Sequence, residues 1–183
     1  AGIRMKEKNR NILIGAILMI SGAGLSILLT LVYGSVLGGS LAGQVEAMAQ
    51  DAAFAAQLAD TGMTMDAFVE AMQGTLNILL GLVVVFHVAK IVVGVLGIRK
   101  AAQPAAFFVV SGAVFLLLGV LGMMFSGVTS VFGLCDLAGG VFGPALFLWG
   151  GVQNKRAYQR MLKEEQAAEE QAAETAWPPV RKE

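Results

Sequence analysis

Four long stretches of this chain contain no Asp, Glu, Lys or Arg, and they constrain its fold more than any other feature. They cover residues 11–45, 71–89, 101–135 and 137–154. Each can supply the roughly 20 apolar residues that a membrane helix needs. The chain is 56% hydrophobic and only 14% charged, which is more apolar than an ordinary soluble domain. The sequence therefore predicts an all-α integral membrane protein with a four-helix transmembrane bundle.

The predicted membrane domain covers residues 11–153, with spans at 11–37, 75–98, 105–128 and 132–153. The first span is too long for a cleaved secretory signal, so we expect it to be retained. Residues 154–183 are predicted to form a helical tail, because the tandem EEQAA repeats at 164–173 consist of good helix formers. Trp177, Pro178 and Pro179 would end this tail, either as a frayed terminus or as a docking peptide.

An outer helical segment, residues 38–74, is predicted between spans one and two. Apolar residues recur there at helical spacing, which indicates a short amphipathic helix. They are Val45, Met48, Ala52, Ala55 and Leu58. Thr64 is expected to cap a second helix that continues into span two. These helices would either lie on the bilayer surface or form a cap that a partner or a second copy recognises.

Charged residues are segregated between the two sides of this topology. If residues 1–10 are cytoplasmic, all thirteen Lys and Arg residues except Lys90, which lies within span two, fall on the cytoplasmic side, including Arg99, Lys100 and Lys155. The outer side carries acidic groups such as Asp51, Asp66 and Asp136. This split follows the positive-inside rule. It predicts a multi-pass protein of the cytoplasmic membrane with both termini and the tail in the cytoplasm.

His87 and Lys90 are the strongly polar residues deep within a span, and they share one helix face with Gly94 and Gly97. A Lys in a membrane costs about 2.5 to 3.5 kcal/mol on insertion scales, so this face is a candidate permeation or proton-linked site. Alternatively, Lys90 extends toward cytoplasmic phosphates while neutral His87 donates to a neighbouring carbonyl. Counting helical rise puts Lys90 roughly 20 Å from Asp136, which predicts that the two cannot pair within one copy.

Small residues at regular spacing indicate where helices approach closely. Two GxxxG steps, Gly34 to Gly38 and Gly139 to Gly143, are candidates for contacts between helices or between copies. Pro144 lacks the N–H that would bond to the carbonyl of Gly140, so a kink is expected in span four.

Catalysis is poorly supported by the residue inventory. One His and one Cys cannot form a multi-His zinc site or a CxxC redox pair. We therefore expect no enzyme activity, no metal and no cofactor. The expected partners are the lipid bilayer and either further copies or another membrane protein, with no nucleic acid.

The layout resembles uncharacterised bacterial four-span proteins, with an outer helical segment, a basic turn after a glycine-rich span (GVLGIRK, residues 94–100) and a glycine-rich closing hairpin. It is similar to claudins and tetraspanins in topology only, because their tryptophan and cysteine motifs are absent. Two functions are predicted from these features. One is a self-associating scaffold or accessory subunit of an inner-membrane complex, and the other is a homo-oligomeric channel or small transporter with His87 and Lys90 on its polar face.

Overall fold

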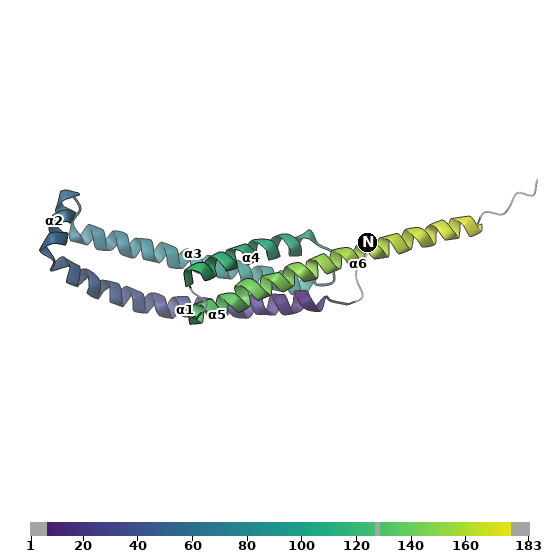
Figure 1. Cartoon of the computed structure of the whole chain (residues 1–183), viewed down its shortest axis with the longest axis horizontal. Helices are drawn as coiled ribbons and strands as arrows, with labels where there is room; N and C mark the ends of the chain where they lie inside the picture. Colours follow the sequence, from purple (N-terminus) through teal and green to yellow (C-terminus); the bar gives the residue numbers. More distant parts are fainter. Residues whose placement is uncertain (1–6, 127–128, 177–183) are drawn as a thin grey trace, which may run out of the picture.

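A computed structural model describes residues 7–126 and 129–176, and most of the chain is helical (Figure 1). The main helices are α1 (Arg10–Ala49), α3 (Met65–Lys100), α4 (Ala106–Ser126) and α6 (Gly143–Ala176). Shorter elements are α2 (Ala52–Asp60), α5 (Val131–Asp136) and the π-helix η1 (Leu137–Phe142). Four helices are long and apolar enough to cross a membrane. The predicted all-α four-span bundle is confirmed, while Trp177, Pro178 and Pro179 lie outside the described residues.

The four long helices form an open arc rather than a closed ring. Helix α1 packs against both α3 and α6, and α6 packs against α4, whereas α3 and α4 touch each other little. Side chains from α1, α4 and α6 form a buried core around Phe108 and Phe147, together with Ile12, Met19 and Phe115, and partly buried side chains of α3 pack against it. This core lies in the half of the bundle nearest the termini, which we call the termini end. The opposite end is called the stalk end.

Helices α1 and α3 extend beyond the hairpin that α4 makes with α6, and α2 joins their far ends (Figure 1). Helix α4, with 21 residues, is about 32 Å long and matches the hydrocarbon core of a bilayer. Helix α1, with 40 residues, is about 60 Å long and exceeds it. We call residues 38–79 the stalk. The continuation of span two from Thr64 was predicted, but the apolar length of span one did not reveal that α1 continues as an unbroken helix to Ala49.

The stalk differs from the predicted outer segment in where its helices begin. The apolar face that was expected from Val45 to Leu58 is divided, because Asp51 accepts hydrogen bonds from the amides of Ala53 and Phe54 and starts a new helix. The cap at Thr64 is confirmed, since its hydroxyl accepts from the amide of Ala67. The chain turns between these helices at Gly62, whose φ of 72° favours glycine.

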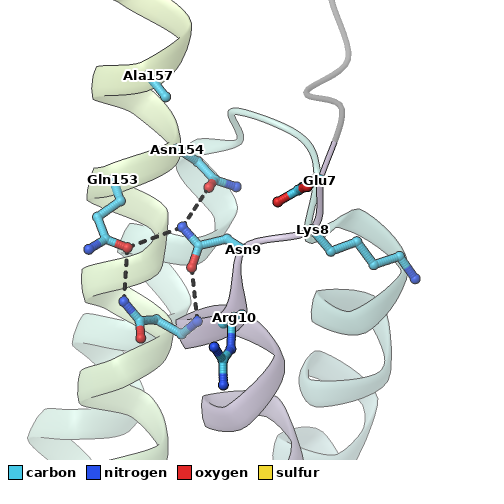
Figure 2. A pocket seen from close by; sticks show the side chains of 8 residues that line it. Glu7, Lys8, Asn9, Arg10, Gln153, Asn154 and Ala157 are labelled. Carbon is cyan, nitrogen blue, oxygen red and sulfur yellow. Dashed lines mark hydrogen bonds between the residues drawn. The ribbon is translucent and has the colours of Figure 1, made fainter.

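An asparagine network fastens the termini end (Figure 2). Asn9 donates from Nδ2 to Oδ1 of Asn154 at 2.8 Å, and its amide donates to the carbonyl of Ala101 at 3.2 Å. Buried Asn154 in turn donates to the carbonyls of Ala101 and Gln103 at 3.0 and 3.1 Å. These bonds join α1, α6 and the turn between α3 and α4. The turn between α3 and α4 is therefore held against α1 and α6 at this end.

The irregularity that Pro144 predicts in span four appears as a π-helix. The amide of Gly143 donates to the carbonyl of Ala138, five residues back, at the end of η1. Proline cannot donate a hydrogen bond to the residue four positions earlier, which favours such a local change of helix type. Short π-helical turns often accompany functional sites, and η1 directly follows Asp136.

Candidate functional site

A cavity of about 450 Å³ lies between α1, α3, α4 and α5 in the stalk-end half of the bundle. The cavity walls nearer the stalk end are apolar and aromatic, and they include Tyr33, Leu80 and Phe132. Its floor is polar and carries Ser26, Thr30, His87, Lys90 and Asp136. A largely apolar chamber with a few convergent polar groups is the usual form of a ligand site.

Lys90 is the largest side chain that the bundle buries almost completely, with 1% of its surface exposed. Its Nζ lies 4.6 Å from the centroid of the Phe86 ring, one helical turn closer to the stalk end. This is the usual direction, because helical side chains lean toward the helix N-terminus. The alternative in which Lys90 extends toward the termini-end surface is therefore wrong, and the ammonium group faces the cavity floor.

Lys90 and Asp136 are neighbours, so the prediction that they cannot approach each other within one copy is wrong. Nζ of Lys90 and Cβ of Asp136 lie 3.4 and 3.7 Å from the point that a Cβ atom on Gly140 would occupy. The two groups also interact electrostatically and line the same cavity. The expected separation assumed that spans two and four begin at the same level.

The extension of α3 into the stalk explains why the predicted separation of Lys90 and Asp136 was too large. The ring of Tyr33 contacts Phe132 with centroids 5.0 Å apart, and Gly34 lies against Leu80. These contacts set the start of α5 level with Leu80 and not with the stalk residues near Thr75. Asp136 thus lies deeper along α3 than a count from the predicted end of span two suggests, and the long lysine side chain covers much of the remaining distance.

His87 presents an unsatisfied nitrogen to the interior. The residue is 6% exposed, and its Nδ1 has no hydrogen-bond partner among the described residues. The predicted bond to a neighbouring carbonyl is therefore not seen at this atom. A buried polar atom without a partner costs free energy, and because Nδ1 is itself enclosed, a ligand would hydrogen-bond here after the ring turns toward the cavity.

The cavity opens sideways between α3 and α4, which touch each other little. Val83 on α3 and Leu118 on α4 line it and are each 40% exposed, which places them at its mouth. Below the mouth, the Phe86 ring packs on Phe115 with centroids 5.7 Å apart. The phenylalanine core then fills the bundle toward the termini end. The chamber thus opens between α3 and α4 and toward the stalk end.

The predicted polar face is buried as a whole but serves two purposes. His87 and Lys90 line the cavity, whereas Gly94 and Gly97 lie further toward the termini end and pack against other helices. A Cβ atom on Gly94 would lie 2.7 Å from Ile20, and one on Gly97 would overlap the Phe147 ring. The two glycines therefore permit close helix packing and do not line the cavity.

Three of the four GxxxG glycines make contacts within the chain. Gly139 lies against Gly22, where an added Cβ would be 2.8 Å from the Cα atom of Gly22. Gly143 similarly packs against α1, and Gly34 meets the Leu80 side chain. Gly38 has open space around it in the stalk. Of these four glycines, Gly38 is thus the one that leaves room for a contact between copies.

Sequence reasoning missed the hydroxyl and aromatic part of the site. Ser26 and Thr30 are separated by four residues and lie on one helix face, and both are buried in α1. The four-residue spacing of these two hydroxyl side chains was the sequence feature that could have indicated a polar face on α1. The aromatic contribution of Tyr33 and Phe132 had no signal in the sequence, because it depends on how α5 folds back against α1.

No family model matches this chain, and comparison with curated proteins and with solved structures found no similar protein. The resemblance to bacterial four-span proteins therefore stays a prediction.

Proposed function

We propose that the protein is a membrane-embedded binding protein that takes a small amphipathic molecule from the bilayer into the cavity between α3 and α4. The observation that carries this proposal is the polar floor of Lys90, Asp136 and His87 beneath a mouth between α3 and α4, which in a bilayer would face the lipid. A polar cluster inside a membrane is costly, so it calls for a functional reason. Binding supplies one, since the unsatisfied Nδ1 of His87 would gain a partner.

This role refines the accessory-subunit function that the sequence predicts. The alternative of a homo-oligomeric channel or small transporter would need a path between copies, because the aromatic core fills each bundle beneath the cavity. The single His and single Cys favour binding over catalysis. We further propose a bacterial cytoplasmic membrane with the termini inside, since Arg99, Lys100 and Lys155 belong to the termini end. The cavity would then open toward the outer leaflet.

A bulky side chain at the mouth of the cavity tests the proposed binding function. Val83→Trp places an indole at the cavity entrance, where the valine is partly exposed and the fold can accommodate it. Val85→Trp is a matched control, because Val85 is 66% exposed and does not line the cavity. Each variant is purified in mild detergent, and co-purifying small molecules are identified by native mass spectrometry.

We expect the wild type and Val85→Trp to retain a small amphipathic molecule and Val83→Trp to lose most of it. Equal retention by all three proteins, or no retained molecule in any of them, would argue against the binding function.

Self-association is a separate part of the proposal and is assigned to the stalk. Gly38→Leu adds a bulky side chain in open space, so the fold should persist while any stalk-mediated oligomer weakens. Gly139→Leu should instead disrupt the protomer, because it meets the backbone of Gly22. The native mass of the two variants separates these effects. An unchanged oligomer mass for Gly38→Leu would exclude this face as the contact.

A further inference from the structure

Resting on the proposed binding function, we infer that the cavity selects molecules with an uncharged, hydroxyl- or carbonyl-bearing head. The inference comes from the charge balance of the floor, and it names the ligand class that the site would accept. Lys90 and Asp136 line the same part of the cavity, where both approach Gly140, and an ammonium and a carboxylate group have opposite charges. The floor is therefore polar but has no net charge.

A charged head would upset this balance. A carboxylate or phosphate head could bind Lys90, but it would add a second negative charge beside Asp136. An ammonium head could bind Asp136, but it would add a second positive charge beside Lys90. In either case the cavity would hold one uncompensated charge within the membrane, which is strongly unfavourable. An uncharged head leaves the pair intact.

The remaining polar groups suit a head that both donates and accepts hydrogen bonds. Nδ1 of His87 has no partner among the described residues, so a hydroxyl could satisfy it in either tautomer. The Thr30 hydroxyl already donates to the carbonyl of Ser26 at 2.7 Å, which leaves its oxygen as an acceptor. The apolar walls at Leu80 and Phe132 would cover the start of a hydrocarbon tail.

Three probes with the same twelve-carbon tail test this selectivity. They are dodecan-1-ol, dodecanoate at pH 8 and dodecyltrimethylammonium, titrated against purified protein in mild detergent with thermal stabilisation as the readout. We expect dodecan-1-ol to bind the wild type at least tenfold more tightly than either ion. Tighter binding of an ion, or no binding of any probe, would overturn the inference.

Variants of the pair shift the preference in opposite directions. Lys90→Met leaves the negative charge of Asp136 and should favour dodecyltrimethylammonium, whereas Asp136→Asn leaves the positive charge of Lys90 and should favour dodecanoate. The double variant is uncharged again and should prefer dodecan-1-ol. It also keeps the test decisive if a single variant fails to fold. A preference that is the same in all variants would contradict the charge-balance argument.

This test is distinct from the mouth experiment. If Val83→Trp loses a co-purified molecule whose head is charged, the binding function stands and the inference about its head group fails. If Val83→Trp and Val85→Trp behave alike, the binding function itself fails.

Discussion

Replacing one member of the buried charge pair should destabilise the bundle, and replacing both should not. Lys90→Met keeps the length and apolar stem of the side chain but removes the charge that balances Asp136. Lys90 is only 1% exposed, so solvent offers little compensation for the group left behind. Breaking a buried ion pair on one side costs about 3 to 5 kcal/mol in proteins. We expect a loss of about 3 kcal/mol in the free energy of unfolding.

Asp136→Asn should cost a similar amount, because it leaves the ammonium group of Lys90 without a counter-charge. The double variant Lys90→Met/Asp136→Asn removes both charges and should lie within about 1 kcal/mol of the wild type. The two substitutions would then show a coupling energy of about 5 kcal/mol in magnitude, as expected for residues whose charges balance each other.

The measurement is reversible unfolding in mixed detergent micelles, followed by the helical circular dichroism signal. Val92→Met serves as a control for adding methionine to α3, since Val92 is exposed and its replacement should change stability by less than about 0.5 kcal/mol. If Lys90→Met is as stable as the wild type or more stable, Lys90 is not balanced by Asp136. Additive effects of the two substitutions would lead to the same conclusion.

Three further predictions concern packing, polar contacts and topology. Gly119→Ala should destabilise by about 2 to 3 kcal/mol, because its Cβ would overlap the backbone of Gly140, whereas Gly24→Ala meets open space and should change stability by less than about 0.5 kcal/mol. Asn154→Ala should cost about 2 to 3 kcal/mol in the same unfolding assay, since it removes three hydrogen bonds at the termini end; a loss below about 0.5 kcal/mol would contradict this role. In a Cys135→Ser background, a cysteine replacing Asp51 should react with an impermeant label on intact cells and one replacing Lys100 should not; the reverse pattern would invert the proposed orientation.

The fold could be predicted from the sequence because it depends on local properties. Uncharged stretches of sufficient length specify membrane helices, and the Thr64 cap and the helical tail follow from residue preferences. The relative heights of the helices could not be predicted in this way. They depend on which contacts form between elements, such as Tyr33 with Phe132, and those contacts decide whether Lys90 meets Asp136.

The sequence accordingly predicted the polar residues of the candidate site but not the other side chains that line it. His87 and Lys90 stand out because polar residues are rare within spans. Gly94 and Gly97 share their face, yet Ile20 and Phe147 occupy the space beside them, and no periodicity identifies which large side chain on another helix will fill a given gap. The cavity exists because α3 and α4 separate on the stalk-end side of Phe86. This separation depends on how all the helices pack together, so no single segment of the sequence predicts it.

The helical connection from Asp136 through η1 to Asn154 makes the site sensitive to chain length as well as to residue identity. Asp136 lies directly before η1, while the rest of α6 is anchored by Asn154 at the termini end. A regular α-helix turns by about 100° per residue. Removing one residue from the regular helix between Pro144 and Asn154 would therefore rotate Asp136 by about that angle relative to Asn154 and turn its carboxylate away from Lys90, whereas η1 already holds its extra residue without such a rotation. A single-residue deletion of an apolar position would then act on the cavity as a charge substitution does, with every polar residue still present in the chain.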